Sequence, residues 1–500
     1  MRRGPLVLLA VAAAAFPAAA SGASVTVLHR DGRATVRNDP FVTGPAITPA
    51  PASTAAAPHR RPSPRARTAV ASGATAHPAG KPRRPPPVTV FSELARIYRT
   101  HAISATAYRG YVNGLESALA SERRLRGTRR IELDAVTETL HQIAVSHQLT
   151  ASRLPALFAT LQANQRWWTS GPLLTADQRV EFAGSQLVWE FYPGQGIQLQ
   201  VLGSFGKANG LYTGGPADYP QMEQLLSELI PLAARRGGGL TWEYYFSFDG
   251  GAPPWTSAMS QATGLEALAR AYRATGVGSY LGVGVRALPI FGVPPPVGVD
   301  VRTARGIRFL QYTFAPNTAI INAFLQTLIG LDTFATVSGN PTAASLFAAG
   351  NAEAQAELPG YDTGAWSLYQ PGVEDTLSYH ELVTGFLATL CTLTATPVYC
   401  TTAEHFEAYL TRPPVLTQLT FRGSATATGS LRFQLSKYSH VGIVVTRGAA
   451  TVFATSGDFG YGVQGVALPR LAAGSYGVRL AATDLAGNFA RISGSLQITR

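Results

Sequence analysis

The chain has 500 residues, which is too long for one compact core and indicates two to four domains. Its 46% hydrophobic and 14% charged residues are typical of a globular protein with a large buried body. The net charge of +12 does not indicate nucleic-acid binding, because residues 24–88 hold ten Lys or Arg against two Asp and leave the rest of the chain nearly neutral.

Residues 1–23 have the layout of a secretory signal peptide. Arg2 and Arg3 form a short positive region, residues 6–16 are apolar, and small residues follow up to Ala23. The alternative is an N-terminal anchor that is not removed. No later stretch has the roughly 18 consecutive apolar residues of a spanning helix. We therefore expect a secreted, extracellular or cell-envelope protein.

Residues 24–88 are predicted to be a disordered linker rich in Pro, Ala and Arg. A weak hairpin pattern over residues 24–42, with a turn at Asp31-Gly32, is the exception. From residue 46 to residue 87 Pro and Ala dominate, and no fixed structure is expected there. The basic residues would either contact an anionic envelope surface or only keep the segment hydrated.

The central part predicts helices, then a short β region, then helices again. Residues 89–177 carry apolar side chains at helical spacing, and the pair Trp167-Trp168 should fill the gap between these helices and the next domain. Residues 178–412 begin with alternating strands and turns and continue as helices. Within them, residues 319–331 are apolar on nearly every side and should form an inner, buried helix. Alternating inner and outer helices suggest an α/α toroid.

The C-terminal residues 415–500 are predicted to be short strands separated by Gly, Ser, Asp and Asn. GSYGV followed by DLAGN resembles the final hairpin of bacterial immunoglobulin-like domains. The fold expected for the whole chain is therefore multidomain α+β: a toroid-like helical domain preceded by a small β region and followed by an Ig-like β-sandwich. This last domain lacks any ordered cluster of acids or His, so it should be a binding or spacer module.

Cys391 and Cys400 are the two cysteines of the chain. After export a disulfide is permitted between them. The alternative is two buried thiols on adjacent helices. Two cysteines without His or acid partners nearby do not make a zinc site, and no metal is expected.

Familiar catalytic motifs are missing: the sequence has no GxSxG, no HExxH, no phosphate-binding loop and no dinucleotide fingerprint. Instead, Tyr312, Tyr361, Tyr369 and Tyr379 gather beside helices that should be buried. The Gly-rich, aromatic segment GYDTGAWSLYQPG interrupts two of these helices, and such loops at the ends of rigid elements commonly carry sites. The alternative is that the aromatic rings only cap the helical core.

Several segments between residues 180 and 412 resemble, in the same order, the D-glucuronyl C5-epimerase family. LPGYDTGAWSLY is similar to the family's YDTGSGTIYDL segment, and Tyr361 and Tyr369 are eight residues apart in both. SYH at 378–380 is similar to its aspartate-tyrosine-histidine motif. AIINAFLQTLIGLD (319–332) is similar to the family's LNGFMYSLIGLYD, and AMSQA (258–262) is similar to its AMGQGQA. FYP (191–193) with Gln198 is similar to its YFYPIQIAQYGL. Tyr312 lies ten residues before Asn322, as the family's EEY tyrosine lies before its equivalent asparagine.

This resemblance implies an enzyme that inverts C5 of D-glucuronyl units in an anionic, uronate-containing polysaccharide. The neighbouring carboxylate acidifies the C5 proton, one group removes it and another reprotonates the opposite face, with no redox or nucleotide cofactor. Tyr379 would transfer the proton, Tyr369 would orient or protonate, and Tyr312 would contact substrate or share the acid role. A cation or donors would have to lower the tyrosine pKa from about 10. The implied substrate-binding or positioning residues are Tyr361, Gln261, Asn322, His380, Gln311 and Tyr192.

The sequence departs from the family at two charged positions. Gln311 stands where the family has a glutamate before its tyrosine, and the arginine that follows the family's second tyrosine is missing. The neighbouring residues that could replace the lost acid or cation are Glu374, Asp375 or Glu381 and Arg305 or Arg308.

Three functions therefore stay open. They are a uronyl C5-epimerase, a polysaccharide lyase that starts with the same proton abstraction, and a catalytically silent glycan-binding or structural envelope protein. The tyrosine spacing favours the two enzymes, whereas Gln311 and the missing arginine favour the third function. The sequence does not determine the oligomeric state.

Overall fold

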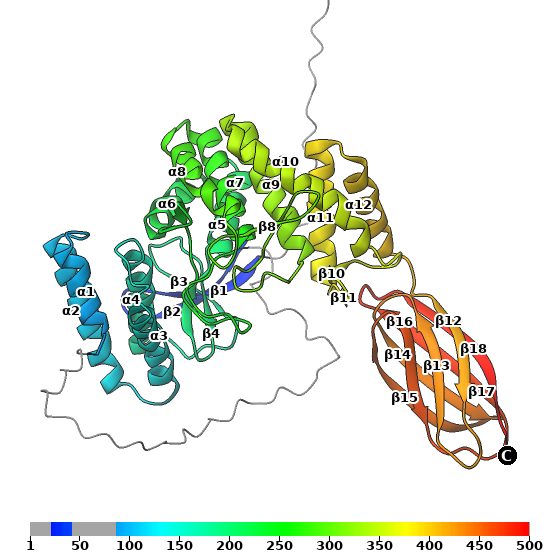
Figure 1. Ribbon diagram of the computed structural model, residues 1–500. Helices are drawn as coiled ribbons and strands as arrows, with labels where there is room; N and C mark the ends of the chain where they lie inside the picture. Colours follow the sequence, from blue (N-terminus) through cyan, green and yellow to red (C-terminus); the bar gives the residue numbers. More distant parts are fainter. Residues whose placement is uncertain (1–21, 43–86, 500) are drawn as a thin grey trace, which may run out of the picture.

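The computed structural model describes residues 22–42 and 87–499, and Figure 1 shows the order of its parts. Four helices lie beside a small β-sheet, a body of paired helices follows, and a β domain forms the C-terminal end. Within the described ranges no helix is both long and apolar enough to cross a membrane. The predicted signal peptide, except for its last two residues, and the Pro-rich segment 43–86 lie outside the described part.

The N-terminal hairpin, which the sequence predicted only as a weak pattern within a linker, belongs to the sheet. β1 (Ala23–Leu28) and β2 (Ala34–Asp39) pair antiparallel around Gly32, whose φ of +83° suits the turn. β1 also pairs in parallel with β3 (Arg179–Phe182), which gives the five-stranded order β2-β1-β3-β4-β5. The hairpin pattern over residues 24–42 is therefore confirmed, whereas its assignment to a disordered linker and not to the sheet was wrong. Pairing with a strand far along the chain leaves no local pattern in the sequence.

A buried ion cluster joins this hairpin to the helical body. Lys207 of α5 (Val201–Gly214) is 1% exposed, and its Nζ lies 2.9 Å from Asp39 Oδ2 and 2.7 Å from Glu181 Oε1. Arg37 binds the same two carboxylates from a more exposed position. The two acids therefore neutralise a lysine that would otherwise be costly to bury.

The N-terminal helical region packs on this sheet through the predicted tryptophan pair. Its helices are α1 (Val90–Arg99), α2 (Ala105–Arg124), α3 (Gly127–Val145) and α4 (Leu154–Ser170). Trp167 and Trp168 are fully buried near the end of α4. Trp167 meets the edge of Phe182 at 5.9 Å, and Trp168 meets that of Phe191 at 5.4 Å. The last two strands of the sheet are β4 (Trp189–Tyr192) and β5 (Gly196–Leu199).

The helical body consists of helix pairs arranged side by side, with α5, α7, α9 and α11 as successive neighbours (Figure 1). Each of these packs with the helix that follows it in the chain. The bounds are α6 (Tyr219–Leu229), α7 (Ala258–Thr275), α8 (Ser279–Ala287), α9 (Ile321–Ser338), α10 (Pro341–Glu357), α11 (Leu377–Thr394) and α12 (Pro397–Tyr409).

The inner helix α9 is buried along most of its length, as the sequence predicts for residues 319–331. It lies close to α7 at Gly330, where an added Cβ would lie 2.1 Å from the carbonyl oxygen of Ala262. In the last pair, Cys391 of α11 and Cys400 of α12 form a disulfide. The disulfide, rather than two separate thiols, is therefore the arrangement in the structure.

Three short hairpins connect the helices of the body. They are β6 (Ala234–Arg236) with β7 (Gly239–Thr241), β8 (Asp300–Arg302) with β9 (Ile307–Phe309), and β10 (Leu368–Gln370) with β11 (Val373–Glu374). The β10–β11 hairpin joins α10 to α11 and lies between α11 and the C-terminal β domain (Figure 1).

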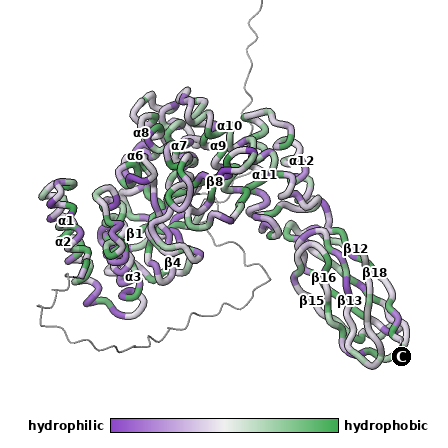
Figure 2. Tube along the Cα trace, viewed as in Figure 1, coloured by the Kyte–Doolittle hydropathy of each residue, from purple (hydrophilic) through white to green (hydrophobic). Residues whose placement is uncertain are grey.

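The C-terminal β domain, residues 415–499, consists of two sheets around one hydrophobic cluster. The sheet orders are β12-β13-β16 and β15-β14-β17-β18. Phe433, Ile443 and Leu480, from both sheets, lie fully buried in the cluster, and hydropathy varies along the strands (Figure 2). The bounds are β12 (Leu416–Arg422), β13 (Gly429–Leu435), β14 (Ser439–Arg447), β15 (Ala450–Phe459), β16 (Gly462–Leu468), β17 (Gly474–Asp484) and β18 (Phe489–Ile498). The chain thus has the expected mixed helical and β content.

The ion cluster at Lys207 predicts that Asp39→Ala lowers the free energy of unfolding by about 3–5 kcal/mol, because it removes a buried partner of a buried charge. Urea unfolding followed by circular dichroism measures this change. The matched control is Asp31→Ala, whose partner Arg33 is exposed, and it should leave the unfolding midpoint unchanged. Equal midpoints for the two variants would contradict the assigned role.

Candidate functional site

Three of the predicted tyrosines come together from separate segments of the chain. Tyr312 follows β9, Tyr369 lies in β10, and Tyr379 lies in the first turn of α11. The rings of Tyr369 and Tyr379 meet at a tilted angle of 66° with centroids 5.1 Å apart. Tyr312 also acts on Tyr369 and raises the pKa of its hydroxyl. We refer to Tyr312, Tyr369 and Tyr379 as the tyrosine cluster.

Local sequence explains how two of these tyrosines are positioned. Thr376 caps the N-terminus of α11, and its hydroxyl accepts a hydrogen bond from the backbone N–H of Tyr379 at 3.4 Å. Before β10, Gly364 takes a φ of +82°, and the hydroxyl of Thr363 accepts the backbone N–H of Trp366 at 2.9 Å. The loop therefore enters β10 in one defined direction.

The tyrosine cluster is buried unequally. Tyr312 and Tyr369 are each 2% exposed, whereas Tyr379 is only half-buried. Burial raises the pKa of both Tyr312 and Tyr369 well above the ordinary value, and the neighbouring tyrosines raise it further. The expectation of a lowered tyrosine pKa was therefore wrong for these two residues. At neutral pH they are uncharged phenols that can donate a proton.

An aromatic wall surrounds Tyr312. Its ring stacks on Phe314 at 5.2 Å and contacts Phe248 and Trp255 at 5.5 and 5.7 Å. A further ring, Phe246, packs on Trp255 at 5.5 Å. Four of these five rings are buried and only Phe314 is partly exposed, so the wall keeps water from the Tyr312 hydroxyl.

Next to Tyr369 lies a buried polar array of Asp375, Ser367 and His380. Ser367 Oγ is 2.5 Å from Asp375 Oδ2 and 2.7 Å from His380 Nδ1, and His380 Nε2 is 2.9 Å from the carbonyl oxygen of Phe406. All three side chains are at most 2% exposed. The array ties the loop before β10 to α11 and α12.

The protonation of this array follows from its geometry. The carbonyl of Phe406 requires a hydrogen on His380 Nε2, so Nδ1 is an acceptor. A protonated Asp375 can donate to Ser367, which then donates to His380. An ionised Asp375 instead accepts a hydrogen bond from the Ser367 hydroxyl. His380 Nδ1 then accepts only the backbone N–H of Ser367, at 3.3 Å. Burial raises the pKa of Asp375 to about 7 and lowers the pKa of His380 to about 4.

Other predicted substrate-binding residues are structural in this fold. The amide of Gln261 donates to the carbonyl of Trp242 at 2.8 Å and accepts its N–H at 3.1 Å. Tyr361 donates to the carbonyl of Ala319 at 2.9 Å. Gln261, Tyr361 and His380 are buried with their polar atoms bonded to protein, so in this structure they hold neighbouring segments in place.

The remaining predicted residues lie closer to the tyrosine cluster or keep unused polar atoms. Gln311 accepts a hydrogen bond from Ser257 at 3.4 Å and also interacts with Tyr312. Asn322 begins α9 and is 4% exposed, and its Oδ1 has no hydrogen-bond partner within the described part of the chain. Tyr192 bonds to Gln200 and stacks on Phe246 at 4.6 Å, so that aromatic rings connect it to Tyr312.

Of the five expected replacements for the missing charges, two are engaged elsewhere and two are exposed. Arg308 binds Glu357, while Arg305 and Glu381 are exposed. Glu374 accepts two backbone N–H groups of the C-terminal β domain. Asp375 is the candidate that acts electrostatically on Tyr369.

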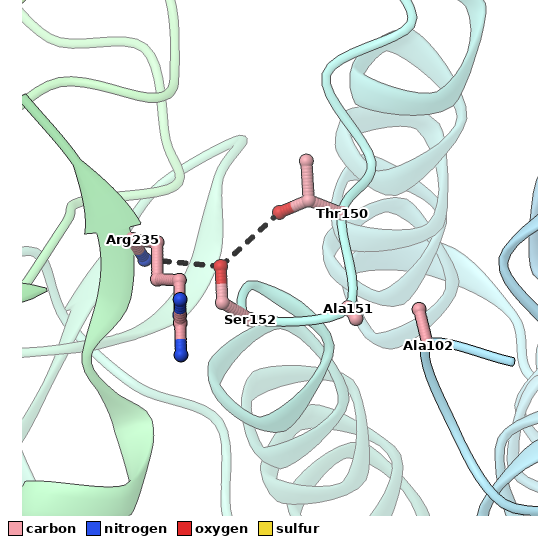
Figure 3. Close-up of a pocket in the computed structure, with 5 residues that line it drawn as sticks. All are labelled: Ala102, Thr150, Ala151, Ser152 and Arg235. Carbon is pink, nitrogen blue, oxygen red and sulfur yellow. Dashed lines mark hydrogen bonds between the residues drawn. The ribbon is translucent and has the colours of Figure 1, made fainter. Parts of the chain in front are cut away.

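The hollow drawn in Figure 3 is separate from the tyrosine cluster. It has a volume of about 410 Å³ and lies between the N-terminal helices and β6. Ser152 accepts the backbone N–H of Arg235 there at 3.0 Å. The hollow shares no lining residue with the tyrosine cluster, and apart from Arg235 it is lined by small side chains.

Comparison with known proteins identifies the region that contains the tyrosine cluster. Residues 237–408 match the family described as D-glucuronyl C5-epimerase C-terminus. Residues 237–408 belong to the D-glucuronyl C5-epimerase family. All three tyrosines of the cluster lie inside this epimerase region, together with Asp375.

Two curated relatives match parts of the chain. A D-glucuronyl C5-epimerase of Caenorhabditis elegans is 30% identical over 130 residues, which cover 23% of this chain and 21% of the relative. An uncharacterized protein of Methanocaldococcus jannaschii is 30% identical over 137 residues, which cover 26% of this chain and 44% of the relative. The chain thus spans less than half the length of either relative.

Two solved structures match over 57% of this chain and 74% of their own length, at 10% identity. They are a cellobiose 2-epimerase from Bacillus thermoamylovorans, with a TM-score of 0.33, and a sugar epimerase from a ruminal bacterium, with a TM-score of 0.35. Likeness at this level adds nothing to the assignment of the epimerase region.

One residue of the polar array, Ser367, could not be predicted from a motif or a period in the sequence. Ser367 is an ordinary serine of the aromatic loop, and only its spacing from Asp375 and His380 around the hairpin brings them together. Phe248 and Trp255 lie in a long irregular segment after β7, where no periodicity marks them as neighbours of Tyr312.

The polar array predicts a pH-dependent stability, and Asp375→Asn removes the part that Asp375 contributes. Because the pKa of Asp375 rises from 3.8 to about 7 on folding, its contribution to stability is lost as the pH rises from about 4 to about 7. His380 acts in the opposite sense, since its folded pKa of about 4 lies below 6.5. Asparagine keeps a donor toward Ser367 and cannot ionise. Relative to wild type, the variant should gain on the order of 3 kcal/mol across this interval.

Urea unfolding at a series of pH values measures this difference. The control is Asp458→Asn on the exposed part of β15, which should follow the wild-type profile. Parallel profiles for wild type and Asp375→Asn would show that Asp375 does not change its protonation in this range.

Proposed function

We propose that the protein is a secreted or cell-envelope carbohydrate epimerase that inverts C5 of D-glucuronyl units within an anionic polysaccharide. The observation that carries this proposal is the meeting of Tyr312, Tyr369 and Tyr379 in the epimerase region. The name of the Caenorhabditis elegans relative supports the substrate class. The proposal includes an α/α-toroid-like arrangement for the helical body and an Ig-like character for the C-terminal β domain.

The roles follow from the different surroundings of the tyrosines. Tyr379, the most accessible member of the cluster, acts as its phenolate and takes the proton from C5, which the adjacent uronate carboxylate has acidified, so that Tyr379 becomes a neutral phenol. Tyr312 and Tyr369 are neutral phenols, so one of them donates a proton to the opposite face. The aromatic wall around Tyr312 excludes water from its hydroxyl.

A silent glycan-binding scaffold is the second candidate, and one observation favours it. The leading charge effects on Tyr312 and Tyr369 come from other tyrosines and acids rather than from a cation, so nothing helps these residues to ionise. Arg308, a possible partner for the substrate carboxylate, already binds Glu357. Such a protein would bind the polymer without exchanging its C5 proton.

The proposal predicts that the purified protein incorporates deuterium from heavy water at uronyl C5 of glucuronate-containing polysaccharides. Tyr379→Phe should reduce the rate by about 100-fold or more, because proton transfer by a positioned group contributes this much. The matched control is Tyr399→Phe, since Tyr399 is also buried but bonds to Asn351 on α10, away from the cluster. NMR of the polymer measures both rates.

Each outcome of this experiment points to one function. Exchange that is lost in Tyr379→Phe and kept in Tyr399→Phe supports the epimerase. Unsaturated, ultraviolet-absorbing ends would reassign the protein as a polysaccharide lyase. No exchange in a broad panel, with retained binding of the polymer, would overturn the enzymatic proposal in favour of the silent scaffold.

A further inference from the structure

The strand that carries Tyr369 has little support of its own. β10 and β11 form a separate two-stranded sheet, and their register shifts between Leu368 and Gln370. An isolated two-stranded hairpin is marginally stable in water. The position of the Tyr369 hydroxyl therefore depends on what holds the two ends of this hairpin.

One end is held by the C-terminal β domain through Glu374. Its Oε1 accepts the backbone N–H of Tyr438 at 2.8 Å, and its Oε2 accepts the backbone N–H of Tyr461 at 2.8 Å. Tyr438 directly precedes β14, and Tyr461 lies in the turn between β15 and β16. One carboxylate thus links both sheets of the domain to the last residue of β11.

The other end is held by a lysine that the C-terminal β domain inserts into the helical body. Lys437 is 1% exposed, and its Nζ lies 2.8 Å from the carbonyl oxygen of Tyr409, 2.6 Å from that of Arg412 and 2.5 Å from Asp484 Oδ2. The same ammonium group stands over the ring of Trp366 at 5.1 Å. Its charge is therefore satisfied at the boundary between the two parts.

Trp366 transmits this contact to the polar array. Its indole N–H donates to the carbonyl of Asp375 at 2.9 Å, and its ring stacks on His380 at 3.7 Å. Trp366 stands three residues before Tyr369 in the same loop. A further tie, from Asn488 Nδ2 to the carbonyl of Leu410 at 2.8 Å, fixes the turn between β17 and β18 on the end of α12.

We propose that the C-terminal β domain helps to form the site. Glu374 and Lys437 are positioning residues that hold Tyr369 within the tyrosine cluster. A spacer module would contact the body through its connecting segment. Here the half-buried Glu374 joins the β10–β11 hairpin to the domain, and the buried Lys437 of the domain reaches the loop before the hairpin. The catalytic consequence rests on the proposed function, whereas the positioning itself can be measured without any substrate.

The test uses the full chain with Glu374→Ala, Glu374→Gln and the control Glu381→Gln, an exposed acid on the neighbouring helix α11. Hydrogen–deuterium exchange by mass spectrometry follows the peptide that covers residues 366–376. Alanine should speed the exchange of this peptide by about ten-fold, because the two hydrogen bonds that the Glu374 carboxylate accepts from the C-terminal β domain are lost. Glutamine keeps one acceptor and should be intermediate, and the control should match wild type.

A second readout is the rate of C5 deuterium incorporation. Misplacing Tyr369 should lower kcat by about ten-fold or more in Glu374→Ala, with KM nearly unchanged and partial rescue in Glu374→Gln. Unchanged protection of residues 366–376 in Glu374→Ala would overturn the proposal, and so would a loosened hairpin with full kcat. If wild type itself shows no C5 exchange, the proposed function fails, and the protection measurement alone then decides whether the domain positions the hairpin.

Lys437→Met provides an independent variant. It removes the ammonium group beneath Trp366 and should also loosen residues 366–376, and pairing it with Asp484→Asn avoids leaving a buried charge behind. If the double variant is folded by circular dichroism and protects residues 366–376 as well as wild type does, the role of Lys437 is refuted.

Discussion

Burial of polar groups in the loop between α10 and α11 is the constraint on which the site depends. This loop leaves the helical layer, forms β10 and β11, and returns to start α11. A buried loop must satisfy its polar groups internally. Ser367, Asp375 and His380 do this on one side, and Glu374 does it on the other. The same bonds that make the loop possible also determine where Tyr369 points.

The electrostatics of the site favour neutral groups. Asp375, His380, Tyr312 and Tyr369 are all shifted by burial toward their uncharged forms. Such a region suits a reaction in which a negative charge develops on the substrate and is relieved by proton donation. It does not suit permanent binding of a carboxylate by a nearby cation. The loss of the family's glutamate to Gln311 agrees with this character, because an amide is neutral at every pH.

Much of the architecture could be predicted because it depends on local patterns. Helical spacing identified the inner helix α9, and the order of short motifs identified the epimerase region and its three tyrosines. Contacts between distant segments could not be predicted in this way. The pairing of β1 with β3, the burial of Lys207 and the insertion of Lys437 beneath Trp366 each join residues that no period or motif connects. The direction of the tyrosine pKa shifts was missed for the same reason, since it depends on burial.

The N-terminal hairpin has a consequence for the Pro- and Arg-rich segment that follows it. Val42 is 3% exposed at the end of the hairpin, and Val90 is 6% exposed at the start of α1, so both ends of the segment 43–86 are attached to folded structure. The hairpin is therefore held to the body by its pairing with β3 and by the ion cluster at Lys207, independently of that segment. A single proteolytic cut within it would leave β1 paired with β3 and Asp39 bound to Lys207, and the two fragments would stay together as a non-covalent complex.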